Sequence, residues 1–159
     1  MQFFLLFITL IMGNLTIAFA EQMKFDHIVI DNVWIKDTPP NQKTTAGYLT
    51  IENLSDTDET LLSVSSSFAV KGEIHQMMID SQVMKMRPVR GGLVIPAGEI
   101  LYLKPGSFHL MFRKLNVQII PMQKHEITLT FKNLGSVVVA ANVKSAPTRD
   151  NPGAEKHNH

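Results

Sequence analysis

The sequence contains no cysteine among its 159 residues. Without thiols the chain forms no disulfide, and a lipid-modified cysteine cannot anchor it to a membrane. The same absence excludes thiol catalysis, thiolate zinc sites, iron–sulfur clusters and blue-copper electron-transfer sites, all of which need a cysteine sulfur. Soft-metal chemistry in this protein would therefore depend on imidazole or thioether ligands.

An excess of charge of one sign is also missing, because 15 basic residues are balanced by 14 acidic ones and the net charge is +1. No cluster of Lys and Arg with interleaved aromatic residues is present. Nucleic-acid binding depends on a concentration of positive charge, so we expect no nucleic-acid partner.

Long hydrophobic runs are limited to residues 1–20, which carry no charged side chain and end in Ala18-Phe19-Ala20 before Glu21. Small residues in this arrangement are typical of a signal-peptide cleavage site. We therefore expect residues 1–20 to be a secretory signal peptide that directs the protein to the periplasm, with an uncleaved membrane anchor as the alternative. No later segment approaches the roughly 20 apolar residues of a membrane span.

A helical apolar period is absent as well, and short strand-like runs between turn residues take its place. These runs cover 29–35, 48–52, 61–65, 70–79, 100–103, 108–112, 127–131 and 137–143. Seven or more short strands at this spacing are typical of a β-sandwich or barrel. We predict one all-β domain over 21–143 and a flexible polar tail over 144–159.

Methionine is abundant, and histidines stand beside several of the nine methionines. Three pairs have a spacing of two residues: His75 and Met77, Met84 and Met86, and His109 and Met111. In a strand that spacing places both side chains on one face. A thioether does no acid–base chemistry, but together with imidazole it suits Cu(I). Zinc usually adds carboxylate or thiolate ligands, and calcium prefers oxygen.

Four segments resemble, in order, the signature of the PCuAC family of periplasmic copper chaperones: EIHQMM (73–78), VMKMRPV (83–89), GLVIPAGE (92–99) and LKPGSFHLMF (103–112). As in that signature, a His is followed by ten residues and a Met, and a His-x-Met triplet comes later. The similarity extends from about Trp34 to near Val143 and so covers most of the mature chain. Glu99 and Ser107 depart from the family, in which a second glycine is common at each of these turns.

The resemblance implies a cupredoxin-like Greek-key β-sandwich that binds one Cu(I) ion through His75, Met86, His109 and Met111. It further implies a metallochaperone rather than an enzyme. Such a protein would hand copper to an acceptor, such as an oxidase subunit or a thiol-bearing assembly factor, during assembly of respiratory oxidase copper centres. We expect a monomer.

Several alternatives stay open at the level of sequence. Met77 and Met84 share faces with proposed ligands, so they are either spare thioethers that help to pass copper on or packing residues. Met78 faces the other way, and we expect it in the core. His157 and His159 either hold Cu(II) at a second site or belong to a solvated tail. The main functional alternative is a metal-free secreted β-sandwich binding module, which would be marked by a patch of exposed aromatic residues.

Overall fold

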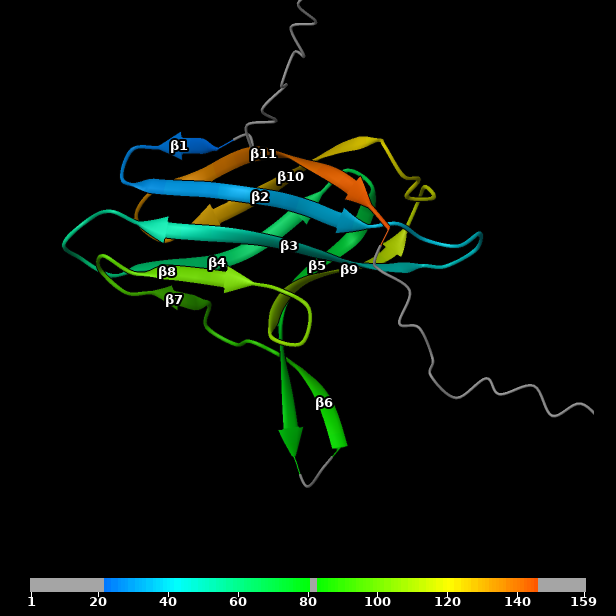
Figure 1. The fold of residues 1–159 in the computed structure, drawn as a ribbon, viewed down its shortest axis with the longest axis horizontal. Helices are drawn as coiled ribbons and strands as arrows, with labels where there is room; N and C mark the ends of the chain where they lie inside the picture. The colour runs from blue at the N-terminus through cyan, green and yellow to red at the C-terminus, as the bar shows by residue number, and fades with distance from the viewer. Residues whose placement is uncertain (1–21, 81–82, 146–159) are drawn as a thin grey trace, which may run out of the picture.

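The computed structural model describes residues 22–80 and 83–145, and all regular elements in these ranges are β-strands (Figure 1). They are β1 (Met23–Phe25), β2 (Ile28–Lys36), β3 (Thr44–Asn53), β4 (Glu59–Ser66), β5 (Ala69–Asp80), β6 (Val83–Pro88), β7 (Leu93–Ile95), β8 (Ile100–Leu103), β9 (Phe108–Leu115), β10 (Lys124–Phe131) and β11 (Gly135–Lys144). Within the described residues, no helix has the length and hydrophobicity that a membrane crossing requires.

The strands form one hydrogen-bonded path in the order β6-β5-β9-β3-β2-β11-β10-β4-β7, with β1 added to β2 and β8 added to β3. β2 and β11 run parallel, whereas the strands that carry the candidate ligands, β5, β6 and β9, pair with their neighbours in antiparallel fashion. The path curls until β4 lies against β5, so that two layers enclose the core (Figure 1). The all-β architecture predicted from the short strand-like runs is therefore confirmed.

Alternation along the strands builds the core, because successive side chains point to opposite faces. On β9, Leu110 and Phe112 are fully buried and the ring of Phe112 lies 4.9 Å from that of Phe68. His109 and Met111 alternate with them along the strand and therefore point to its opposite face. The apolar positions of β9 thus fix which way the candidate ligands point.

Most strand predictions are correct to within a few residues, and the differences have simple causes. The run expected over 48–52 begins earlier, because residues 44–47 also belong to β3 and pair with β9. β1, β6 and β7 are not among the expected runs, and β1 and β7 have only three residues each, too few to show an alternating pattern. β11 extends through Lys144, which the sequence had placed in the tail.

The β5–β6 hairpin extends beyond the body of the sandwich (Figure 1). β6 is an edge strand that pairs with β5, and its six residues are all exposed. Nearer the body, β5 pairs instead with β9. The root of the hairpin is therefore the place where β5, β6 and β9 meet, and each of these strands carries candidate ligands.

Candidate metal centre

His75 and His109 are direct cross-strand partners on β5 and β9, and their ring centroids are 5.8 Å apart. His109 is 4% exposed, and the His75 side chain is 13% exposed. Side chains that face each other across an antiparallel pair contact directly. The two imidazoles therefore share one largely buried patch at the root of the hairpin.

His109 is held in a form that can bind a metal. Its Nδ1 lies 3.1 Å from the backbone carbonyl of Ser107, and a bond donated from Nδ1 to that oxygen leaves Nε2 with a free lone pair. Burial lowers the pKa of His109 and the neighbouring His75 lowers it further, although the bond to Ser107 acts in the opposite direction. The neutral ring, which is the metal-binding form, is therefore favoured. Because Ser107 acts through its backbone, its departure from the family's glycine leaves this contact intact.

His75 is the side chain whose surroundings best suit a bound ion. Both ring nitrogens are buried, and neither has a hydrogen-bond partner. Oε2 of Glu73 approaches Nε2 to 3.4 Å as an ion-pair contact, and this buried oxygen likewise has no hydrogen-bond partner. Leaving a buried polar group unsatisfied costs about 1–3 kcal/mol. A bound ion would satisfy a nitrogen that the fold itself leaves unpaired.

The thioethers surround this pair on the same face. Met86 is the cross-strand partner of Met77, so it lies diagonally from His75 across the hairpin. Met111 follows His109 on the same face of β9 and is the partner of Glu73, so it lies diagonally from His75 on the other side. The register thus brings the two histidines together directly and places the two predicted methionine ligands on either side of His75.

These methionines do not fill the core. Among the described methionines, Met23 packs against the core cluster, whereas those near the histidines do not. Met84 and Met86 are 57% and 54% exposed. Packing is the usual role of methionine, and for these two the structure argues against it.

The expectation for Met78 was wrong, because this side chain is 43% exposed rather than part of the core. Its strand position was read correctly as facing away from Met77, but β5 has left the sandwich at this point, so that this face does not enter the core (Figure 1). Residues 1–20, His157 and His159 lie outside the described residues, as does the tail from 146 onward.

Glu73 borders the site and is held by two cations. Lys71 Nζ lies 2.7 Å from one carboxylate oxygen, and Arg113 lies 3.5 Å from the other. The hydrogen bond from Lys71 lowers the pKa of Glu73, burial raises it, and the nearby Lys71 and His75 lower it again, with a net decrease. Across residues 22–80 and 83–145, no three His, Asp or Glu side chains are grouped to hold a metal ion. A metal at the histidine pair would thus draw further protein ligands from the neighbouring thioethers.

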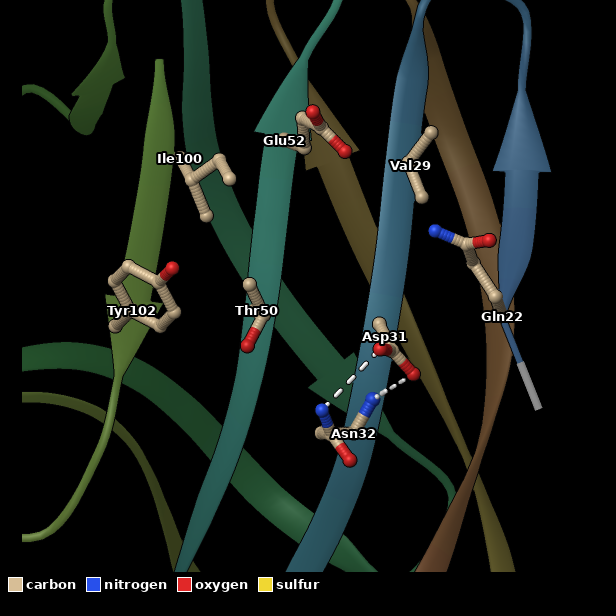
Figure 2. A pocket seen from close by; sticks show the side chains of 8 residues that line it. All are labelled: Gln22, Val29, Asp31, Asn32, Thr50, Glu52, Ile100 and Tyr102. Carbon is tan, nitrogen blue, oxygen red and sulfur yellow. Dashed lines mark hydrogen bonds between the residues drawn. The ribbon is translucent and has the colours of Figure 1, made fainter. Parts of the chain in front are cut away.

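A second polar feature is a shallow depression between β1, β2, β3 and β8, with a volume of about 270 Å³ (Figure 2). Its lining includes Asp31, Glu52 and the exposed Tyr102, and contains neither His nor Met. Both carboxylate oxygens of Asp31 already accept hydrogen bonds from Asn32, one from its backbone and one from its side chain. The depression therefore lacks the soft ligands found on β5, β6 and β9.

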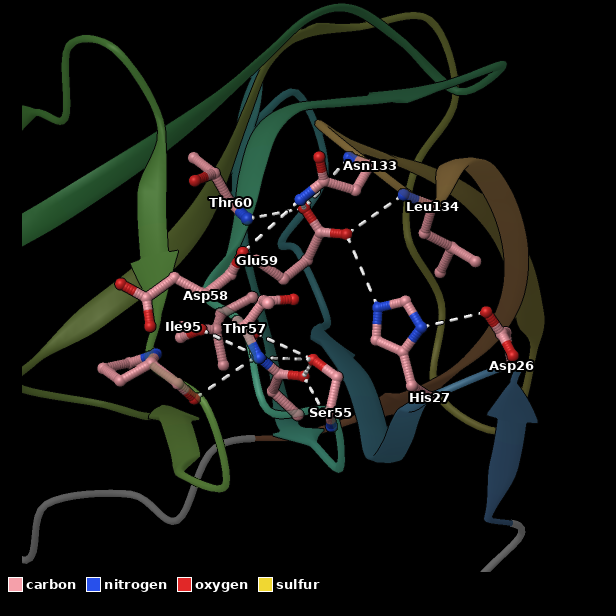
Figure 3. A network of polar contacts seen from close by, with 12 residues as sticks. Asp26, His27, Ser55, Thr57, Asp58, Glu59, Thr60, Ile95, Asn133 and Leu134 are labelled. Carbon is pink, nitrogen blue, oxygen red and sulfur yellow. Dashed lines mark hydrogen bonds and ion pairs between the residues drawn. The ribbon is translucent and has the colours of Figure 1, made fainter.

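A third feature is the network around Glu59, whose carboxylate is buried at the start of β4 (Figure 3). It accepts bonds from the backbone N–H groups of Thr60, Asn133 and Leu134, and lies 3.8 Å from His27. His27, Asn133 and Leu134 reach Glu59 from distant parts of the chain, so this network is a product of the tertiary fold. This network ties three turns together and has no contact with the histidine pair.

Comparison by sequence identifies the family. The family described as "Putative lipoprotein LpqE-like" matches residues 28–143. The chain is also 27% identical over 119 residues to a protein of Leifsonia xyli subsp. xyli (strain CTCB07) that is likewise named as a lipoprotein, and the match covers 75% of this chain and 70% of that protein. Lipoprotein relatives indicate a location outside the cytoplasm, although this sequence contains no cysteine.

Comparison by structure identifies the fold. The copper-bound PCuAC domain from PmoF2 superposes with a TM-score of 0.67 at 17% identity, covering 79% of this chain and 99% of that domain. Apo DR1885 from Deinococcus radiodurans gives 0.60 at 22% identity, covering 92% and 98%. Its Cu(I) form gives 0.55 at 27% identity, covering 73% and 77%. The chain therefore belongs to the LpqE-like family and has the cupredoxin-like β-sandwich of PCuAC domains, which confirms the resemblance seen in the sequence.

Proposed function

We propose that this protein is a Cu(I)-binding metallochaperone of the periplasm that hands copper to an acceptor during assembly of respiratory oxidase copper centres. The proposed ligands are His75, Met86, His109 and Met111. The observation that carries the proposal is the opposed, buried histidine pair, in which His75 leaves both ring nitrogens without a partner. On the same face, Met86 lies diagonally from His75 on one side and Met111 on the other.

The ligand chemistry favours Cu(I). Imidazole and thioether are neutral donors that suit a soft monovalent ion, and no thiolate is present to retain it. The proteins described as copper-bound PmoF2 and Cu(I)-DR1885, which share this fold, support the same choice of metal.

Partial exposure of the site favours transfer over storage. His109 is buried, but Met86 is more than half exposed on an edge strand. An acceptor that carries thiolates could therefore reach the ion from the Met86 side and take it by stepwise ligand exchange, because thiolates are softer and anionic. The proposed role requires no catalytic step.

The alternative of a metal-free binding module predicts a patch of exposed aromatic rings. Instead, Trp34 and Tyr48 stack on each other at 4.4 Å, and Tyr48 continues the row toward His109 at 6.4 Å. Tyr102 is exposed at the depression in Figure 2 as a single ring. These three rings therefore do not form one exposed aromatic patch, because Trp34 and Tyr48 pack on each other and Tyr102 stands apart.

A competition titration tests the site. Met86→Ala and Met111→Ala should each weaken Cu(I) binding by about tenfold or more, but should disturb Cu(II) less, because Cu(II) depends on nitrogen and oxygen donors. His75→Ala and His109→Ala should weaken both ions. Met122→Ala is the matched control, because Met122 is 96% exposed and lies away from β5, β6 and β9. Unchanged Cu(I) affinity in both methionine variants would contradict the four-ligand site.

The physiological role needs a separate test. A host strain that lacks the gene should assemble respiratory oxidase with a reduced copper content, and added copper should restore it. Complementation with the His75→Ala chain should fail where the native chain succeeds. Normal copper loading of the oxidase in the deletion strain would argue against this acceptor while leaving copper binding itself intact.

A further inference from the structure

We propose that Met77, Met84 and Met86 form a second, thioether-only Cu(I) position on the β5–β6 hairpin, next to the histidine pair. This inference rests on the proposed function, because it treats the hairpin as the route by which the ion enters and leaves. The position would be the outer of the two and would share Met86 with the inner site, with the two lone pairs of the Met86 sulfur bridging the ions when both are bound.

The strand register brings the three thioethers to one face. Met77 and Met86 are direct cross-strand partners, and Met84 is two residues from Met86 on the same strand. Neighbours on one face of a strand are about 6.6 Å apart, and cross-strand partners have Cβ atoms about 4.5–5.5 Å apart. Methionine is unbranched and flexible, so three such side chains can converge on one ion.

The exposure of these side chains argues that they serve something other than folding. Met84 and Met86 are more than half exposed, and Met77 is half-buried outside the core cluster. They stand on a hairpin that projects from the sandwich (Figure 1) and ends the sheet. Exposed apolar residues at a sheet edge promote aggregation. A ligand function explains why this edge carries thioethers.

The other face of the hairpin provides an internal comparison. Met78 is also exposed, but its cross-strand partner is Lys85, and Arg87 is the next residue on that face of β6. On this face a metal cation would meet only one thioether ligand, and the nearby positive charges would repel it. The two faces therefore differ in the number of thioethers and in charge.

A gradient of burial runs along the proposed route. His109 is 4% exposed and the His75 side chain 13%, whereas Met86 and Met84 are 54% and 57% exposed. Cu(I) can move along this gradient by exchanging one neutral ligand for another. Neither the charge of the site nor the oxidation state of copper changes in such an exchange.

The first test uses the native chain with its methionine methyl groups labelled with ¹³C, titrated anaerobically with Cu(I) and followed by NMR. The second equivalent of Cu(I) should shift the methyl signals of Met77 and Met84, while Met78 and the 96% exposed Met122 stay in place. If Met77 and Met84 respond no more than Met122, the thioether position does not exist.

The second test measures binding and transfer in matched variants. The Met77→Leu/Met84→Leu double variant keeps the apolar volume and removes two thioethers. It should bind the second equivalent about tenfold more weakly and release Cu(I) more slowly to the chelator bicinchoninate, while its first equivalent binds as in the native chain. Met78→Leu is the control and should behave as native. A double variant that matches this control overturns the proposal.

The histidine ring signals separate this inference from the proposed function. If Cu(I) shifts the rings of His75 and His109 but leaves Met77 and Met84 unchanged, the hairpin position is overturned and the inner site stands. If the methionine signals respond while the rings do not, the hairpin position is supported and the histidine-centred site is wrong.

Discussion

Glu59 is 1% exposed and nevertheless carries a carboxylate into the interior. Burial raises the pKa of Glu59, but hydrogen bonds from the backbone of Thr60, Asn133 and Leu134, together with the nearby His27, lower it, and the net change is a decrease. The ionised form is thus favoured in the folded state. At the histidine pair, by contrast, His75 is buried without any such partners.

For Glu59, the lowered pKa predicts a pH-dependent stability. A carboxylate whose pKa is lower in the folded chain stabilises it above the unfolded value of about 4.3, and this stability is lost as the pH falls through the folded pKa. Glu59→Gln should therefore cost about 1–3 kcal/mol of unfolding free energy at pH 7 and flatten the acid limb of the stability profile. Urea unfolding from pH 3 to pH 7 measures this. Asp56→Asn, at an exposed site, is the control, and identical profiles for Glu59→Gln and the native chain would contradict the prediction.

For His75, the unpaired nitrogens predict a conflict between stability and function. His75→Leu removes two unsatisfied buried atoms, so the apo protein should keep its unfolding free energy or gain about 1 kcal/mol, while Cu(I) affinity falls. Ile74→Ala, next to it and 5% exposed, should cost about 2–5 kcal/mol and serves as the comparison for a lost core contact. Thermal melts and a Cu(I) titration measure both effects. A loss in His75→Leu as large as in Ile74→Ala would show that His75 is a packing residue.

At the scale of the element, β5 serves both the body and the hairpin. It pairs with β9 at its inner end and with β6 at its outer end, while β4 packs against it. The close approach to β4 occurs at Gly72, where an added Cβ would lie 2.3 Å from the carbonyl oxygen of Val64. Glycine at this position therefore sets where β5 crosses the sandwich and, with it, where His75 and Met77 lie.

Gly72→Ala should disturb the whole strand. The clash is with backbone, which cannot move aside as a flexible side chain can, so we expect a loss of about 1–3 kcal/mol of unfolding free energy. Displacement of β5 from β9 should also weaken Cu(I) binding, although no ligand has changed. Val70→Ala, on the same strand and 74% exposed, should stay within about 0.5 kcal/mol of the native chain. A native melt and native Cu(I) affinity in Gly72→Ala would contradict this account of the strand.

At the scale of the whole molecule, the core is complete without metal. Its cluster of buried residues draws on both layers of the sandwich, and the candidate ligands lie outside it. We therefore expect a fold that buries this core to form without an ion, in contrast to small metal-dependent domains. The proposed metal centre would thus be an addition to one edge of a finished domain.

The apo protein should therefore melt cooperatively with a β-rich circular dichroism spectrum. Cu(I) should raise its stability only by ligand linkage, which amounts to about 2.7 kcal/mol when the free ion is at one hundred times its dissociation constant. Melts in a chelator and with increasing Cu(I) measure this. A random-coil spectrum after chelation would mean that the metal is structural, and the chaperone proposal would lose its basis.

Much of the fold and part of the site followed from local pattern. Alternation predicts β8 at its observed bounds and β2, β5 and β10 to within three residues. On β9, Leu110 and Phe112 are two residues apart and thus share one face, which the structure buries. Within a strand, a spacing of two residues fixes that side chains share a face, whatever the rest of the chain does. The sequence could therefore predict that His75 shares a strand face with Met77, and His109 with Met111.

What only the tertiary structure decided is how the separate strands meet. The register that sets His75 opposite His109 and Met77 opposite Met86 comes from pairing between distant segments, as do the bonds that Asn133 and Leu134 donate to Glu59. Met78 was misplaced for the same reason, because its exposure depends on where β5 leaves the sandwich. Periodicity is a property of the local backbone, whereas register, burial and the grouping of ligands depend on contacts that no short stretch of sequence contains.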